Sequence, residues 1–93
     1  MMPEADGTAS PIPPGELAGL REFELRVGAY AGHRHPERPQ WVELDGERVE
    51  VASVESEWRE EERLGWLVTL RDSRRLLLYY VPNEDLWSGV VLT

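Results

Sequence analysis

The stretch WVELDGERVEV, residues 41–51, decides the fold of this chain. Apolar and charged residues alternate on both sides of Asp45–Gly46, and this period of two is typical of strands with one buried face. An Asp-Gly pair is a strong hairpin signal, because a type I′ turn requires positive φ at both central residues. The predicted cross-strand pairs are Leu44 with Glu47, Glu43 with Arg48, Val42 with Val49 and Trp41 with Glu50.

The spacing of the apolar residues changes after this hairpin. Up to Val51 they occupy odd-numbered positions, whereas Val54 and Trp58 occupy even-numbered positions. A β-bulge near Ala52–Ser53 would explain the change, since a bulge adds one residue to a strand. A helix over about residues 50–62 is the competing interpretation. β-Branched residues lead into this segment without a helix cap, which favours the strand.

The segments on either side also have strand character. EFELRVGAY, residues 22–30, alternates with a period of two and predicts the first strand. WLVTLRDSRRLLLYYV, residues 66–81, predicts a second hairpin around Ser73–Arg74. Its predicted pairs are Asp72 with Arg75, Leu70 with Leu77, Val68 with Tyr79 and Trp66 with Val81. Residues 76–81 are apolar on both faces, which predicts a central strand covered on both sides.

The two ends of the chain complete the predicted architecture. PNED, residues 82–85, supplies turn residues, and residues 86–92 predict a last strand with a bend or a close backbone approach at Gly89. Residues 1–16 are rich in proline and predict a flexible, disordered arm, which leaves residues 17–93 as a single small β domain. The predicted class is all-β: a small antiparallel β-barrel or a strongly curved sheet of five to six strands.

The composition restricts the classes of function. The 93 residues carry 18 acidic and 10 basic side chains, and the formal net charge of −8 disfavours direct binding to a phosphate backbone. Cysteine is absent, so disulfides and thiolate sites are excluded. No apolar run is long enough for a bilayer and no signal peptide is visible, which predicts a cytoplasmic protein without membrane contact.

Both histidines lie in GHRHPERPQW, residues 32–41. On a strand, His33 and His35 would point the same way, as a two-histidine metal site requires. No third ligand stands at a telling distance, and Pro36 and Pro39 predict a connecting loop. The sequence therefore favours a solvated loop, with neither metal nor cofactor, over a metal-binding or small-ligand-binding site.

Catalytic machinery is not apparent either. The acidic stretch EWREEERLGW, residues 57–66, could bring carboxylates together for acid–base work, but successive residues in a turn diverge. An exposed connection is the favoured interpretation, with Arg59 and Arg63 neutralising part of its charge. No histidine stands beside an orienting acid in a glycine-framed turn, and no glycine loop could hold phosphate. We expect a protein without catalytic residues.

Most of the tryptophan and tyrosine rings are interpreted as core residues or as plugs at the ends of a barrel. One or two exposed ones are candidate contacts with a protein partner, since tryptophan and tyrosine are favoured interface anchors. The predicted partner-binding residues are Trp58, Trp66, Leu76, Leu78, Tyr80 and Trp87. The only local basic cluster comprises Arg71, Arg74 and Arg75. It is interpreted as a charged hairpin tip, with contact to single-stranded nucleic acid as the alternative.

The segments PQWVELDGERVEVASVESEW, residues 39–58, and LLLYYVPNEDLW, residues 76–87, resemble a family of small bacterial β-barrel-like proteins of unknown function. The positions that match its pattern are Pro39, Trp41, Gly46, Val51, Val54, Trp58, Leu78, Tyr80 and Trp87. The resemblance covers about residues 39–88. Members are sometimes associated with DNA-damage-tolerance genes, which implies an accessory role near a polymerase complex and carries over no catalytic residue.

Three functions follow as hypotheses. The first is a non-enzymatic interaction module that binds a protein partner of unknown identity or a second copy of itself. The second is an accessory protein of a DNA-repair or polymerase complex that makes weak single-stranded nucleic-acid contacts. The third is a metal-binding or small-ligand-binding protein that uses the His33 and His35 loop.

Overall fold

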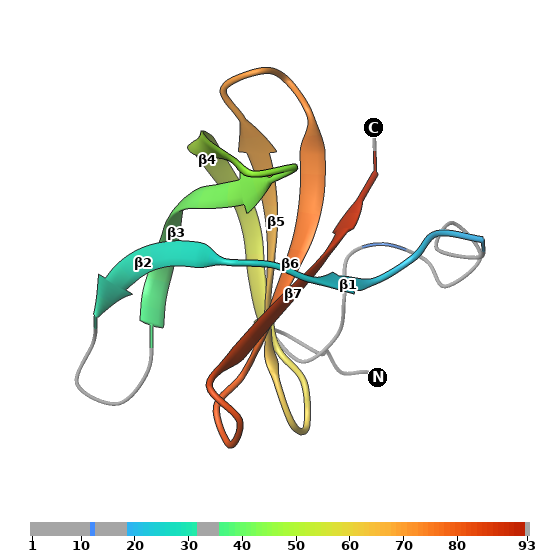
Figure 1. Ribbon diagram of the computed structural model, residues 1–93. Coiled ribbons are helices and arrows are strands. Elements are labelled where there is room, and N and C mark those ends of the chain that lie inside the picture. The colour runs from blue at the N-terminus through green and yellow to red at the C-terminus, as the bar shows by residue number, and fades with distance from the viewer. Residues whose placement is uncertain (1–11, 13–18, 32–35, 93) are drawn as a thin grey trace.

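The computed structural model describes residues 12, 19–31 and 36–92, and this part of the chain is all-β, as predicted (Figure 1). The strands are β1 (Phe23–Glu24), β2 (Val27–Ala31), β3 (Pro36–Leu44), β4 (Glu47–Arg59), β5 (Leu64–Leu70), β6 (Arg75–Val81) and β7 (Leu86–Val91). The described residues form seven strands rather than five or six, because the predicted first strand divides at Leu25–Arg26. The predicted arm lies outside the described residues except for Ile12.

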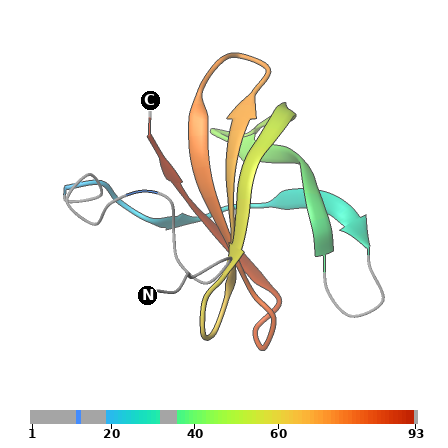
Figure 2. The ribbon, with the colours of Figure 1, turned by 180° about the vertical axis from the view of Figure 1, so that it is seen from behind.

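The seven strands form one antiparallel sheet in the order β1-β7-β6-β5-β4-β3-β2. Its two edge strands, β1 and β2, are separated by only two residues, so the sheet must curl until its edges approach each other. Backbone bonds on both sides hold this closure: the Leu25 N–H donates to the Trp87 carbonyl at 3.2 Å, and the Glu43 N–H donates to the Arg26 carbonyl at 2.9 Å. Figures 1 and 2 show the segment passing across the sheet from β7 to β3. The predicted strong curvature is thus confirmed.

The β3–β4 hairpin has the predicted register. All four pairs from Leu44–Glu47 to Trp41–Glu50 are present, and Asp45 and Gly46 have φ values of 52° and 81°. The sequence could determine this turn because positive φ at two successive positions restricts the choice of residue so strongly.

β3 begins earlier than predicted. Residues 36–40 were expected in a loop because of Pro36 and Pro39, yet they belong to the strand and pair with β2. Pairing of β3 with β4 ends at Trp41–Glu50, so the prolines occupy a stretch that is bonded on one side only. Proline is compatible with such an edge, because its missing N–H leaves no gap in a ladder.

β4 continues through the segment for which a helix was the alternative, and that alternative is wrong. The predicted bulge is confirmed by a register shift between Val51 and Ser53, and a second shift, which was not predicted, lies between Val54 and Ser56. Bulges bend a strand and increase its twist. The bend lets β4 pair with β3 up to Glu50 and with β5 from Val51 onward.

The predicted register of the β5–β6 hairpin is wrong by three residues. The observed pairs include Val68 with Leu76, Leu67 with Leu77 and Trp66 with Leu78. The Leu70 N–H donates to the Arg74 carbonyl, and Ser73 takes a φ of 78°. The Asp72 carboxylate supports this loop by accepting a bond from the Arg74 N–H at 3.1 Å. RDSRR contains no glycine that would have marked a left-handed residue.

Side chains alternate between the two faces of a strand, so a shift of three residues moves every residue of β6 to the opposite face relative to its predicted partners on β5. Trp66 and Val68 now lie on the same face as Leu76 and Leu78, inside the curl, where residues from every side of the sheet form the inner core. Leu77 points outward. As predicted, β6 is central and covered on both faces: Leu76, Leu77 and Leu78 are each 0% exposed.

The β6–β7 connection follows the prediction. Residues 82–85 link Val81 to its partner Leu86, and Asp85 has a φ of 51°. Gly89 lies between Leu78 on β6 and Phe23 on β1, and a Cβ there would lie 3.1 Å from the Leu77 carbonyl. The close backbone approach predicted at Gly89 is therefore present.

Candidate partner-binding site

The residues predicted to bind a partner lie mostly inside the fold. Trp58, Trp66, Leu76, Leu78 and Tyr80 are at most 6% exposed, and Trp87 is half-buried. Five of the six belong to the inner core or pack against it, whereas Trp58 lies on the other face of the sheet. The five stabilise the fold, and a partner could reach them only through the residues that cover them.

An aromatic group fills part of the inner core. The Trp87 ring lies 5.2 Å from that of Trp66 and 5.0 Å from that of Tyr80, measured between centroids. The Tyr80 hydroxyl donates to the Asp85 carboxylate at 2.7 Å, and this bond, aided by desolvation, raises the pKa of Tyr80. The buried Trp66 indole N–H has no hydrogen-bond partner in the described structure. Trp66 and Tyr80 are at most 6% exposed and Trp87 is half-buried, so the group contributes chiefly to packing.

A second apolar group lies on the outer face of β4 to β7, and we call it the outer cluster. Its members are Trp58, Leu67, Leu77, Tyr79 and Val90. All are at most 6% exposed, although the outer face of a small antiparallel sheet is commonly solvated. Ile12 and Leu92, near opposite ends of the chain, pack against this cluster. The predicted β domain thus has two apolar faces.

Trp58 owes its position in the outer cluster to a glycine. It is the register partner of Gly65, and a Cβ built on Gly65 would overlap the Cε2, Cζ2 and Nε1 atoms of the indole. The ring meets that of Tyr79 edge to face, with centroids 6.1 Å apart and an interplanar angle of 84°. Its Nε1–H donates to Glu60 Oε2 at 2.6 Å. The indole is therefore held on its face, at its edge and at its polar atom.

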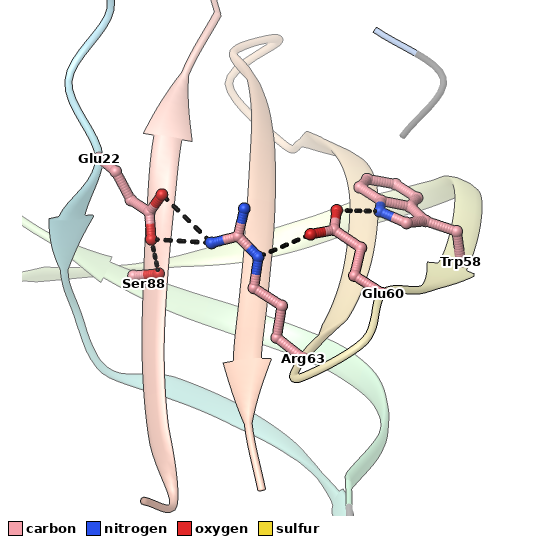
Figure 3. Close-up of polar contacts among 5 residues, drawn as sticks. All are labelled: Glu22, Trp58, Glu60, Arg63 and Ser88. Carbon is pink, nitrogen blue, oxygen red and sulfur yellow. Dashed lines mark hydrogen bonds and ion pairs between the residues drawn. The ribbon is translucent and has the colours of Figure 1, made fainter. Parts of the chain in front are cut away.

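Arg63 organises the polar rim of the outer cluster (Figure 3). Its Nε–H donates to Glu60 Oε1 at 2.8 Å, and NH1 lies 3.2 Å from Glu22 Oε2. Ser88 on β7 also donates to Glu22, at 2.6 Å. The guanidinium carbon stands 3.6 Å from the centroid of the Tyr79 ring, within cation–π distance. One side chain thus connects the β4–β5 turn, the segment before β1 and the outer cluster.

The rim is negatively charged overall. Glu22 and Glu60 both pair with the single cation of Arg63, and the exposed Glu61 and Glu62 follow in the adjacent turn. Desolvation opposes the charge on Arg63, but the hydrogen bond and attraction of Glu60, together with Glu22, outweigh it and raise the pKa of Arg63. The rim would therefore attract positive charge on an approaching molecule.

The stretch 57–66 was predicted to be an exposed connection, but the connection is limited to residues 60–63, because β4 ends at Arg59 and β5 begins at Leu64. Within it, Glu61 and Glu62 are exposed. Glu60 and Arg63 are half-buried and joined by a backbone bond of 2.8 Å from the Glu60 N–H to the Arg63 carbonyl. The sequence does indicate this contact, because Glu60 and Arg63 carry opposite charges and flank the two turn residues. Glu22 and Ser88 could not have been found, because only the closed sheet brings them to Arg63.

The three arginines of the predicted basic cluster are each paired with a carboxylate. The ion pairs are Arg71 with Glu50 at 3.3 Å, Arg74 with Asp72 at 2.8 Å and Arg75 with Glu55 at 2.9 Å. The structure therefore does not gather them into one open cationic surface, which a phosphate backbone would require. Nucleic-acid contact through these arginines stays a prediction.

The carboxylates of these pairs are affected in turn. Hydrogen bonds from Thr69 and Arg75 lower the pKa of Glu55, and hydrogen bonds from the side chain and backbone of Arg74 lower the pKa of Asp72. Both carboxylates are exposed, so salt and water screen these interactions. They order the surface at the hairpin loop without forming a binding pocket.

His33 and His35, the residues of the predicted metal or small-ligand loop, lie outside the described residues. Within residues 12, 19–31 and 36–92, no group of three or more histidine, cysteine, aspartate or glutamate side chains could hold a metal ion. That part of the chain also contains no helix long and apolar enough to cross a membrane.

A hollow of about 610 Å³ lies where the edges of the curled sheet approach each other. Leu25, Leu44 and Val91 contribute apolar surface, and the 37% exposed Phe23 stands at its border. Both charge signs line the rest, with Arg74 near the β3–β4 turn. It lacks the aromatic packing and the polar network of the outer cluster, so it is the weaker candidate.

No family model, curated protein or solved structure matches the chain. The resemblance of residues 39–88 to small bacterial β-barrel-like proteins therefore stays a prediction.

Proposed function

We propose that this protein is a non-enzymatic interaction module that binds a protein partner through the outer cluster. One observation carries the proposal: five large apolar side chains lie on the outer face of the sheet, and in the described structure no helix or second sheet covers them. Each of the five is nevertheless at most 6% exposed, and Ile12 and Leu92 pack against the cluster; full exposure of one such side chain would cost roughly 1.5–3 kcal/mol. The outer face of β4 to β7 therefore requires an apolar cover that the sheet itself does not supply.

The nature of the cluster supports a protein as the ligand. Trp58 and Tyr79 are residue types that dominate interface energetics, and they are held in fixed orientations by Gly65, Glu60 and Arg63. Preorganised aromatic anchors lose little entropy on binding. A polar rim around an apolar centre is also the usual anatomy of an interface.

The polar groups of the rim are directed at one another rather than at a substrate. Glu60 accepts from both Trp58 and Arg63, and Glu22 accepts from Arg63 and Ser88. A catalytic acid, base or nucleophile has to present a reactive atom within hydrogen-bond reach of its substrate. The arrangement therefore supports binding better than it supports chemistry.

Site-specific cross-linking tests the proposal. A photo-reactive residue in place of Leu92, which packs on the outer cluster, should capture a partner in the native cell extract. Capture and the subsequent calorimetric binding of the purified partner should both be lost with Leu67→Glu, which places a charge in the cluster. Leu20→Glu is the matched control, since Leu20 is 41% exposed and lies outside the cluster. A partner that binds the Leu67→Glu protein as well as the wild type would refute the proposal.

Light scattering separates the two kinds of partner. If the partner is a second copy of the chain, the wild type should sediment and scatter as a dimer at micromolar concentration, and Leu67→Glu should be a monomer. If the wild type is a monomer, the partner is a different protein.

A further inference from the structure

We propose that the outer cluster binds extended, proline-containing apolar segments, and that Ile12, which stands between prolines in the sequence, is its resident ligand. An external partner of the same chemistry, with basic residues beside the prolines, would displace it. The inference rests on the proposed function and adds the chemical class of the partner and the means by which access is controlled.

Ile12 contacts the outer cluster directly. Ile12 is half-buried and packs against the same group that includes Trp58 and Tyr79. It lies outside the strands, the first of which begins at Phe23, so it contacts the cluster without being part of the sheet. A tethered segment of this kind competes with any external ligand for the same surface.

The sequence around Ile12 is rich in proline and reads Pro11-Ile12-Pro13-Pro14. Proline fixes its own φ near −65° and disfavours helical geometry in the residue before it, so such a segment is biased toward an extended form before it binds. It therefore loses little conformational entropy on docking, and aromatic-lined surfaces are the known counterparts of such segments. Trp58 and Tyr79 supply the aromatic lining here.

The rim and the N-terminal residues carry net charge of the same sign, which is negative. The rim contributes Glu22, Glu60, Glu61 and Glu62, against which stand Arg63 and the neighbouring exposed Arg59. Residues 1–20 contain no lysine, arginine or histidine, and they add Glu4, Asp6 and Glu16. The resident segment thus matches the apolar centre but not the acidic rim. A competitor with basic flanks satisfies both, which gives it an advantage over the tethered segment.

The size of these effects can be bounded. An intramolecular ligand at an effective concentration on the order of millimolar should weaken external binding by roughly tenfold or more if its own dissociation constant is about 0.1 mM. Two exposed charge pairs should improve binding by roughly two- to tenfold at low salt. That gain should largely disappear near 0.5 M salt, where exposed charges are screened.

Fluorescence anisotropy with synthetic peptides tests the inference. The first peptide copies residues 8–16, TASPIPPGE, and the second carries Thr8→Arg and Glu16→Arg. Each is titrated, up to several millimolar, into the full-length wild type, into full-length Ile12→Asp and into the control Leu20→Asp. We expect Ile12→Asp to bind both peptides at least tenfold more tightly than the wild type and Leu20→Asp to behave like the wild type. The second peptide should bind more tightly than the first at low salt.

Two results would overturn the inference. One is equal binding of the first peptide to the wild type and to Ile12→Asp, or no binding to Ile12→Asp at all. The other is undiminished binding of a peptide that itself carries Ile12→Asp. Circular dichroism melting verifies that the variant protein is folded, and the milder Ile12→Ala replaces it if it is not.

The outcome is separable from that of the proposed function. If the peptides fail while a cross-linked partner still depends on Leu67, the partner has different chemistry and the interaction module stands. If the peptides bind but no partner depends on Leu67, the outer cluster serves only its own arm and the proposed function falls.

Discussion

Replacing Gly65 with alanine should destabilise this protein, although the same change in a strand ordinarily stabilises it by about 0.5–1 kcal/mol. Gly65 does not have positive φ, so the backbone accepts alanine without strain. The obstacle is the Trp58 indole, whose six-membered ring and Nε1 occupy the space of the new methyl group. The outcome thus depends on what it costs to move one tryptophan.

That cost follows from the burial of Trp58, which is only 5% exposed. A buried tryptophan removes about 150–250 Å² from water, which at about 25 cal/mol/Å² amounts to roughly 4–6 kcal/mol for complete expulsion. We expect a partial shift that loses about half of this burial and weakens the bond to Glu60. After the intrinsic gain from alanine is subtracted, the net loss is about 2 kcal/mol, or about 8–16 °C in Tm for a domain of this size.

Gly28 provides a matched control within the same molecule. It is the register partner of Trp41, whose indole would also overlap a new Cβ. Trp41 is only half-buried, outside both hydrophobic clusters, and the Arg48 guanidinium lies over it at 3.9 Å. This ring can swing into solvent at small cost. We therefore expect Gly28→Ala to lose less than about 1 kcal/mol.

Urea unfolding followed by far-UV circular dichroism measures these changes, and a double-mutant cycle isolates their cause. In a Trp58→Ala background the methyl group meets no indole, so Gly65→Ala should be neutral or slightly stabilising there. The reasoning is refuted if Gly65→Ala is as stable as the wild type. It is equally refuted if the substitution costs the same with and without Trp58.

Three further substitutions should separate the inner core, the rim and the surface. Trp66→Phe should cost less than Trp58→Phe in urea unfolding, because the Trp66 indole N–H has no partner whereas that of Trp58 bonds Glu60; the reverse order would contradict these assignments. Arg63→Ala should cost about 1–2 kcal/mol through loss of the contact with Tyr79 and two ion pairs, and a variant as stable as the wild type would show that the rim is dispensable. Glu55→Gln should cost less than about 1 kcal/mol at neutral pH. Since the folded-state pKa of Glu55 is lowered, its contribution is present above the ordinary glutamate pKa and lost as pH falls through the folded value, so melting curves of variant and wild type should converge in acid.

Local chemistry explains which parts of the fold could be predicted from the sequence. Asp45–Gly46 determined a turn and, through it, four cross-strand pairs. The β5–β6 loop could not be predicted in the same way, because Ser73 adopts its left-handed conformation without being a glycine, supported by the Asp72–Arg74 bond. Serine adopts many backbone conformations, so a serine at position 73 does not indicate how many residues the loop contains.

The candidate site was harder to predict than the fold, since it depends on closure of the sheet. Large apolar residues were recognised as candidates, but their distribution between the two faces of β6 followed from the register that was predicted wrongly. Leu77 and Tyr79 reach the outer cluster only with the observed register. The rim needed Glu22 and Arg63, which are 41 positions apart in the sequence. No local pattern indicates such a contact.

The two faces of β6 connect the stability of the domain to its proposed function. A curled sheet encloses the inner core by itself, but the outer face of β4 to β7, which carries Leu77 and Tyr79, is buried with the help of residues outside these strands, Ile12 and Leu92 among them. Whatever covers that face contributes to folding, because it removes apolar surface from water only in the folded state. Displacement of Ile12 without a replacement must then lower the stability, whereas displacement by a partner need not. Binding and folding are therefore linked at this surface, and a partner that binds the outer cluster should raise the melting temperature in proportion to the logarithm of its concentration.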